Sequence, residues 1–517
     1  MSITRRCLRQ LERCKSMSQL RQSHAQVVTT GLGDDAFALS RLLAFCSNPQ
    51  RGSLAYSWDL FRNILNPTIC IFNTMIKSLF LSKEFGDAVR MFKELLERGM
   101  YPDGYTLPYV IGACAKLGAF RVGGSLHCYG AKVGLVYNVF VVNALTAMYC
   151  GDADMKVARQ LFDESPERCV VTSTVMIDGY AKMGDVDGAR LIFDKVFEKD
   201  VGVWGAMISG YVHNGCFKEG LHMFRLMQLE GIVPDEAMLV STLCACSNLG
   251  ELDVGIWIHR YVENRRLPIS ARLGTGLIDM YAKCGRLDLA KKLFEEVPNR
   301  DVACWNAMIS GFAVNGDGGS ALRLFSEMEE GKIMPDDITL IAILTACSHS
   351  GMATQGLKVL RRFVTVHNLI PKSRHYGSLV ELLSQAGLLD EATELLLNVS
   401  YINDTYEEVV AWRALLTASC KHGKVKLAEL AAQRLFDLDC HSGAYILLSN
   451  MYAACGQQNN VRIMRKVMKH RGVGKVPGCS SLQINGQVFE FVAGEKTHSR
   501  TEEICYVINN LNKQANH

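Results

Sequence analysis

The chain repeats a pattern in which two stretches of helical periodicity are separated by a short turn. Between residues 302 and 336, apolar residues recur every three or four positions in one stretch and then, after Asn315-Gly316, in a second. This spacing puts an apolar stripe on one face of each predicted helix. Pro335 and Asp336 break the second helix and start the next unit. The apolar positions are Trp305, Met308, Ile309, Phe312, Ala321, Leu322, Leu324, Phe325 and Met328.

The same motifs return at a fixed distance of 101 residues. Ala206-Met-Ile-Ser-Gly-Tyr211 matches Ala307-Met-Ile-Ser-Gly-Phe312, and Met176–Gly184 matches Leu277–Gly285 at the same offset. The 101 residues divide into units of 35, 35 and 31 residues, each holding two helical patterns. The predicted repeats are 36–68, 69–103, 104–138, 139–169, 170–200, 201–235, 236–270, 271–301, 302–336, 337–372 and 373–405, preceded by a degenerate one.

A single helix pair of this kind cannot bury its own apolar face, so neighbouring pairs must stack. We therefore predict an all-α, right-handed superhelical solenoid of helix-turn-helix repeats, with one concave surface and a small C-terminal extension. The predicted domains are a short targeting segment with the degenerate first repeat (1–35), the repeat array (36–405) and the extension (406–517).

Composition and charge narrow the classes of function. A net charge of +4 over 517 residues is too small for bulk attraction to a polyanion, so a nucleic-acid contact must come from a local groove. The 19 cysteines include no CxxC pair, and no His is followed two residues later by Glu, which excludes the signature of a zinc-dependent deaminase. We expect no enzyme, metal or cofactor site. A run of eighteen apolar residues is also missing, so we expect no membrane span.

The N-terminus is rich in arginine and poor in acids. Such a bias is typical of an organelle-targeting peptide, although a basic first helix would look similar. Because the segment is short and Arg-rich, we favour the mitochondrion, with the chloroplast as the alternative. The basic residues are Arg5, Arg6, Arg9, Arg13, Lys15 and Arg21.

The segment Val302-Ala-Cys-Trp-Asn-Ala-Met-Ile309, closed by Pro335-Asp336, resembles the pentatricopeptide repeat. The alternation of 35- and 31-residue units resembles the plant PLS subfamily, which mixes long and short repeats. A tetratricopeptide array would instead keep a period of 34 residues, and it would not include 31-residue units. The resemblance implies a protein that binds single-stranded organelle RNA, with one repeat facing one nucleotide.

In the family, a base is chosen mainly by the fifth residue of a repeat together with its last residue, which we call the reading pair. Asn73 with Asp103 and Asn306 with Asp336 resemble the pair that prefers uracil over cytosine. The resemblance assigns guanine to two further pairs. These are Thr174 with Asp200 and Thr275 with Asp301.

An alternative interpretation needs no RNA, since Asn, Thr and a terminal Asp often cap backbone amides at helix starts. Other repeats depart from the family pattern and are expected to discriminate weakly or to act as spacers. The weak pairs are Gly205 with Asp235, Asn143 with Cys169, and Ser40 with Thr68. The spacers carry Pro108 with Asn138 and Val240 with Ser270.

From about Tyr406 the sequence resembles the E-type extension of this plant subclass. The resemblance rests on Ala411–Leu416, Leu447–Tyr452, Pro477–Ser480 and Ile484–Phe491, although Ser481 stands where the extension usually has tryptophan. Asn485-Gly486 between two alternating segments predicts a β-hairpin.

The E-type resemblance implies site-specific cytidine-to-uridine editing. Because the DYW deaminase domain is not found after the extension, we expect a DYW-type deaminase and editing accessory proteins to act in trans on a monomeric chain. The alternative is a factor of the same fold that stabilises, splices or promotes translation of a transcript. His498 beside Glu502 and Glu503 is interpreted as a solvated helix start.

Overall fold

The computed structural model describes residues 11, 13–33, 35–46, 48, 51–165, 169–367, 372–398, 405–438, 442–473, 479–484, 487–492 and 500–515. Arg5, Arg6, Arg9, the turn at Asn485-Gly486 and His498 lie outside the described residues. The chain divides into two compact units, residues 1–245 and 246–517, and each is described by itself.

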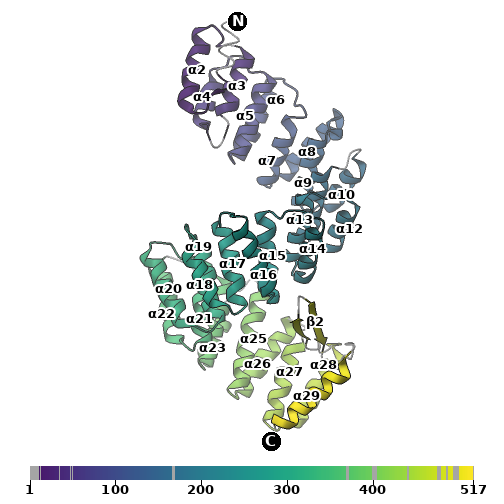
Figure 1. Ribbon diagram of the computed structural model, residues 1–517, viewed down its shortest axis with the longest axis vertical. Helices are drawn as coiled ribbons and strands as arrows, with labels where there is room; N and C mark the ends of the chain where they lie inside the picture. The colour runs from purple at the N-terminus through teal and green to yellow at the C-terminus, as the bar shows by residue number, and fades with distance from the viewer. Residues whose placement is uncertain are drawn as a thin grey trace. The chain divides into compact units, whose positions relative to one another are not determined.

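Helices follow one another in pairs along the first unit (Figure 1). Its elements are α2 (Met17–Thr29), α3 (Ala36–Cys46), α4 (Leu54–Arg62), α5 (Ile69–Leu81), α6 (Phe85–Glu97), α7 (Thr106–Lys116), α8 (Phe120–Lys132), the 3₁₀ helix η1 (Leu135–Tyr137), α9 (Val139–Gly151), α10 (Met155–Glu164), α11 (Val170–Lys182), α12 (Val186–Lys195), α13 (Val201–His213) and α14 (Phe217–Leu229). Helix α15 (Glu236–Leu249) contains the boundary between the units.

The second unit continues the pairs and ends in the extension. Its repeat helices are α16 (Leu252–Asn264), α17 (Ala271–Lys283), α18 (Leu287–Glu296), α19 (Val302–Val314), α20 (Gly318–Glu330), α21 (Asp337–His349), α22 (Ala353–Thr365), α23 (Ser373–Gln385) and α24 (Leu389–Asn398). The extension contains α25 (Thr405–Lys421), α26 (Val425–Leu438), α27 (Ser442–Ala454), α28 (Gln458–His470), β1 (Cys479–Ile484), β2 (Gln487–Val492) and α29 (Thr501–Ala515). The strands pair antiparallel, as the alternating pattern predicted.

Within each unit, the first helix of one repeat packs against the first helix of the next. This contact joins α3, α5, α7, α9, α11 and α13 in the first unit, and α17, α19, α21, α23 and α25 in the second. Each first helix also contacts its own second helix, as α5 contacts α6 and α19 contacts α20. The predicted all-α array of helix pairs is therefore confirmed.

The difference between long and short repeats lies in the second helix. Helices α5, α9, α11, α13, α17, α19, α21 and α23 all have 13 residues. The second helices of the 31-residue repeats, α10, α12 and α18, have 10 residues, whereas α6, α14 and α20 have 13. In these repeats the first helix therefore keeps its length when the length of the repeat changes.

Close helix packing accounts for the repeated Ser-Gly motif. A Cβ atom on Gly311 would lie 2.7 Å from the Cβ of Ala282 in the preceding first helix. Asn315, at the end of α19, donates from Nδ2 to the carbonyl of Ala282 at 2.9 Å and to that of Gly311 at 2.8 Å. Gly316 then turns the chain with a φ of 74°, a conformation that favours glycine. The Asn-Gly turn thus ends a helix and ties it to its neighbour.

Candidate functional site

The two members of a reading pair are placed by different elements. The fifth residue lies in the first turns of a first helix, and the last residue lies at the start of the next first helix. Asp200, Asp301 and Asp336 are the N-cap residues of α13, α19 and α21. Each accepts a backbone N–H from its own helix, so the alternative role as a helix cap is present in the structure.

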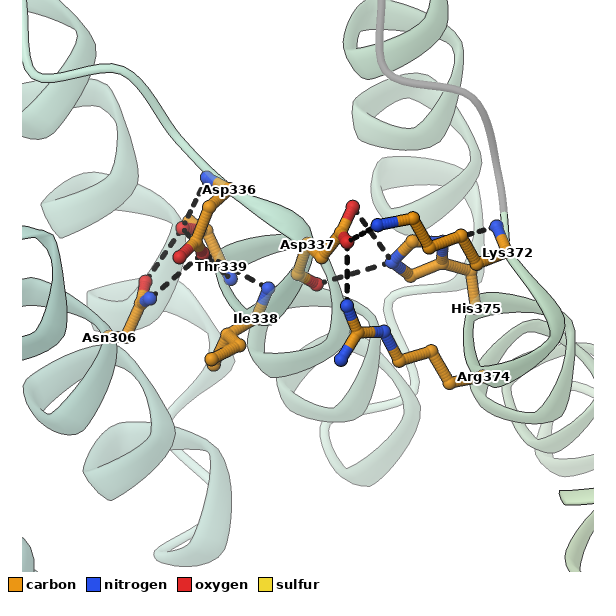
Figure 2. A network of polar contacts seen from close by, with 8 residues as sticks. All are labelled: Asn306, Asp336, Asp337, Ile338, Thr339, Lys372, Arg374 and His375. Carbon is orange, nitrogen blue, oxygen red and sulfur yellow. Dashed lines mark hydrogen bonds and ion pairs between the residues drawn. The ribbon is translucent and has the colours of Figure 1, made fainter. Parts of the chain in front are cut away.

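In the repeat 302–336 the pair is joined by a third residue (Figure 2). Asn306 donates from Nδ2 to Oδ1 of Asp336 at 2.9 Å, and Thr339 donates its hydroxyl to Oδ1 of Asn306 at 2.6 Å. The backbone N–H of Asp336 donates to the Thr339 hydroxyl at 3.1 Å, which completes a capping box. These contacts fix which side of the Asn306 amide carries nitrogen, and they leave one N–H and one lone pair unused.

The repeat 69–103 has the same arrangement. Asn73 donates from Nδ2 to both carboxylate oxygens of Asp103 at 3.1 Å, and Thr106 donates its hydroxyl to Oδ1 of Asn73 at 2.6 Å. We call an asparagine held in this way an oriented amide. The carboxylate of Asp103 also accepts backbone N–H groups of Tyr105 and Thr106 at 2.9 Å.

The oriented amides of Asn73 and Asn306 differ in how far they are exposed to solvent. Asn73 is half-buried and lines a pocket of about 440 Å³ together with Cys70, Lys77, Tyr105 and Tyr109. The Lys77 ammonium lies 5.8 Å from the ring centroid of Tyr109, so aromatic and cationic groups adjoin the amide. Asn306 is only 4% exposed. The pocket at Asn73 is therefore the better-formed candidate for holding a base.

Asn143 is a third oriented amide, in which sulfur replaces the carboxylate. Its Nδ2 donates to Sγ of Cys169 at 3.5 Å, and the Thr172 hydroxyl donates to its Oδ1. Cys169 also lies 3.0 Å from the Thr172 hydroxyl and caps α11. Burial acts to raise the pKa of Cys169, but the hydrogen bonds from Thr172 and Asn143 outweigh it and the pKa is lowered.

The Thr/Asp pairs are arranged differently. Thr174 donates its hydroxyl to the carbonyl of Val170 at 2.9 Å, and Thr275 donates to that of Ala271 at 2.8 Å. Thr174 and Asp200 flank the bare backbone of Gly202, whose ideal Cβ position is 3.7 Å from Thr174 Oγ1 and 3.2 Å from Asp200 Oδ1.

At the remaining predicted positions the structure shows mainly caps. Asp301 caps α19 through the N–H of Cys304, and Asp235 accepts the N–H of Met238, both at 2.9 Å. Gly205, the partner of Asp235, contributes no side chain, and its ideal Cβ position is 3.5 Å from Met238. The expected spacers Asn138 and Ser270 cap α9 and α17.

Sequence reasoning missed the third member of each oriented amide. Thr106, Thr172 and Thr339 all stand three residues after the last residue of a repeat, where a capping box places its N3 residue. A threonine at this position can be recognised in the sequence. It distinguishes the repeats whose fifth residue is asparagine from those whose fifth residue is threonine, which have Val203 and Cys304 at the same position.

Among the residues that the structure describes, no three His, Cys, Asp or Glu side chains are grouped so that they could hold a metal ion. None of the helices described is long and apolar enough to cross a membrane.

These features define a helical-repeat protein whose first helices carry polar side-chain pairs at the joints between repeats. Family models match both the repeats and the extension. The PPR repeat family model matches residues 67–116 and 300–349, and the PPR repeat model matches 171–201, 202–232, 275–302 and 374–398. The E motif model matches residues 422–483. The chain belongs to the pentatricopeptide repeat family, in its E-type PLS subclass.

Known relatives match over most of their length. A chloroplastic pentatricopeptide repeat-containing protein of Arabidopsis thaliana is 33% identical over 96% of this chain and 80% of its own. A mitochondrial one from the same plant is also 33% identical, over 96% of this chain and 87% of its own. The crystal structure of the maize pentatricopeptide repeat protein PPR10 is 17% identical and covers 89% of this chain and 77% of that chain, with a TM-score of 0.44.

Proposed function

We propose that this protein binds one single-stranded RNA sequence in a plant organelle and marks a cytidine there for conversion to uridine. The observation that carries the proposal is the oriented amide at Asn73, which opens into a pocket lined by Tyr105, Tyr109 and Lys77. An asparagine amide has both a donor and an acceptor, which complement a base edge that has an acceptor beside a donor, as uracil has. Tyrosine rings offer stacking surfaces for a base.

The order of the reading pairs defines an RNA sequence. With one nucleotide per repeat, and with the N-terminal repeats toward the 5′ end as in the family, the repeats from 69 to 336 correspond to 5′-UNNGNNGU-3′. Asn73 and Asn306 face the two uridines, and Thr174 and Thr275 face the two guanosines. Asn143 faces the third nucleotide, and Gly205 with Asp235 faces the fifth, where we propose weak discrimination.

The E motif supports the editing role. In the family this extension accompanies cytidine-to-uridine editing, and the proposed deaminase is a DYW-type protein that acts in trans with editing accessory proteins. We favour the mitochondrion, with the chloroplast as the alternative. Relatives that are named chloroplastic or mitochondrial support an organelle without choosing between the two.

A binding assay tests the RNA role. Purified protein should bind a 5′-UNNGNNGU-3′ oligonucleotide more tightly than the same RNA with both guanosines changed to adenosine, and more tightly than duplex RNA. Equal affinity for all three would contradict sequence-specific binding.

Sequencing both organelle transcriptomes of a plant that lacks the protein tests the editing role. We expect one or a few cytidines downstream of a match to this sequence to remain unconverted. If every site stayed converted while one transcript lost abundance or kept an intron, the editing role would be wrong and the alternative of a stabilisation or splicing factor would stand.

A further inference from the structure

The repeat that follows Asn306 ends in a cation, where three earlier repeats end in a carboxylate. The repeats 201–235, 271–301 and 302–336 close with aspartate, but the repeat 337–372 closes with Lys372. Its fifth residue, Ile341, cannot form a hydrogen bond with a base through its side chain. The second residue of the next first helix is Arg374. The joint after this repeat therefore carries two cations, and the repeat has no polar reading pair.

Both cations are held by one carboxylate (Figure 2). Asp337 forms ion pairs with Lys372 and, at 2.6 Å, with Nη2 of Arg374. The Asp337 side chain is 15% exposed, whereas those of Lys372 and Arg374 are 61% and 41% exposed. One half-buried carboxylate therefore positions two more accessible positive charges, and the three side chains together carry a net charge of +1.

Helix stability does not account for these cations. Lys372 is the N-cap residue of α23, where a positive charge opposes the helix dipole. The imidazole of His375 takes over the capping: Nδ1 accepts the N–H of Lys372 at 2.8 Å, and Nε2 donates to the carbonyl of Asp337 at 3.3 Å. Exposed ion pairs of this kind stabilise a fold by only about 0–1 kcal/mol.

The cations lie next to a predicted base position. Asp336, which orients Asn306, and Asp337, which holds Lys372 and Arg374, are consecutive, so their Cα atoms are about 3.8 Å apart. Figure 2 shows their side chains pointing to opposite sides of the start of α21. A nucleotide at Asn306 would thus have its 3′ phosphate on the side of the two cations.

We propose that Lys372 and Arg374 bind the backbone phosphate on the 3′ side of the nucleotide that faces Asn306. The proposal rests on the RNA binding proposed above. Asp337 keeps the two side chains together before RNA arrives, and the repeat 337–372 contributes affinity without reading a base. Two donors on one phosphate are a common basis of sequence-independent contact.

The salt dependence of binding tests the proposal. The probe is 5′-UNNGNNGUNN-3′ RNA, and the variant is Lys372→Ala with Arg374→Ala. The control variant, Lys358→Ala with Arg361→Ala, removes the same charge from exposed positions on the second helix α22. Loss of one phosphate contact should reduce the slope of log affinity against log salt by about 0.7 and leave the control slope unchanged. Affinity in low salt should fall roughly three- to tenfold.

A chemical change in the RNA gives a second readout that does not depend on the folding of a variant. A methylphosphonate at the linkage after the eighth nucleotide removes that phosphate charge. We expect it to weaken binding to the unmodified protein and to have no further effect on the double variant. If the unmodified protein binds RNA but neither change alters binding, the phosphate contact is wrong and RNA binding stands. If it binds no RNA, both proposals fail.

Discussion

Asp336 and Asp337 are consecutive residues whose carboxylates hold side chains at two different joints of the array. Asp336 accepts from Asn306 of its own repeat, and Asp337 pairs with Lys372 and Arg374 at the following joint. Burial acts to raise the pKa of Asp337, but hydrogen bonds from Lys372 and Arg374 outweigh it and the pKa is lowered. Asp337 is therefore a carboxylate at neutral pH, and it belongs to a different joint of the array from Asp336.

Asn73→Thr should convert the first reading pair into the Thr/Asp type. Threonine cannot present an oriented amide, so the variant should lose about tenfold in affinity for uridine at the first nucleotide, which corresponds to about 1.4 kcal/mol. Guanosine there should become the better base. Fluorescence anisotropy with RNAs that differ only at this nucleotide provides the measurement. Asn264→Thr, at an exposed position near the end of α16, is the control and should change neither affinity.

Cys169→Asp should sharpen the reading of the third nucleotide. A carboxylate accepts the Asn143 N–H more strongly than sulfur does, and it would reproduce the contact that Asp103 makes with Asn73. The ratio of affinities for uridine and cytidine at this nucleotide should rise severalfold, while the ratio at the first nucleotide stays constant. An unchanged ratio at both positions would show that sulfur already fixes the amide.

Cys169 should react with iodoacetamide at pH 7.5 before the buried cysteines do. Its pKa is lowered, whereas burial raises the pKa of Cys46 to about 12 and those of Cys150 and Cys347 to about 11. The thiolate is the reactive form. Peptide mass spectrometry over a time course gives the order, and labelling of Cys347 ahead of Cys169 would contradict the assigned hydrogen bonds.

Gly311→Ala should destabilise the array. The new Cβ would lie 2.7 Å from that of Ala282, and the overpacking should cost about 1–3 kcal/mol. Gly319→Ala in the next helix is the matched control because its Cβ would meet only Asp317 at 3.9 Å. That change should stabilise by about 0.4–1 kcal/mol through the unfolded state. Denaturation midpoints in urea report both effects.

Acidification should destabilise the first unit through the half-buried His127. Burial lowers the pKa of His127 below 6.5, although Glu164 opposes this, and its Nδ1 lies 3.0 Å from the Tyr149 hydroxyl. The unfolded chain then binds the proton more tightly, so stability falls as pH decreases below about 6.5. His127→Gln should show a smaller loss of melting temperature between pH 7.5 and 5.5. If the variant and the unmodified protein lost the same melting temperature, the destabilisation by acid would come from groups other than His127.

Much of the fold could be predicted from the periodicity of the apolar residues. Helix pairs that stack on their neighbours in sequence bury faces that are defined by the spacing of apolar residues within each helix. Helices α5, α9, α11, α13, α17, α19, α21 and α23 start at the first residue of a predicted repeat, and α7 starts two residues late, at Thr106. The side-chain cap is the same at α7 and α21: Asp103 accepts the N–H groups of Tyr105 and Thr106, as Asp336 accepts those of Ile338 and Thr339.

The candidate sites were less predictable because they depend on contacts across a joint. The last residue was expected to act with the fifth, but the hydrogen bond from Thr339 to Asn306 joins two helices and was not predicted. The sequence placed Cys169 at the last position of its repeat, but it did not predict that the sulfur would accept the Asn143 N–H. The grouping of Asp337 with Lys372 and Arg374 joins residues 35 and 37 positions apart and has no local pattern.

Eight first helices share a length of 13 residues, and this has a consequence for how such arrays can change in length. An insertion or deletion of one helical turn in a second helix leaves the distance between successive reading pairs intact. The same change in a first helix would rotate every side chain beyond it and misplace the pair at the next joint. Within each unit, length variation in the second helices is therefore compatible with a constant spacing of the side chains that the first helices carry.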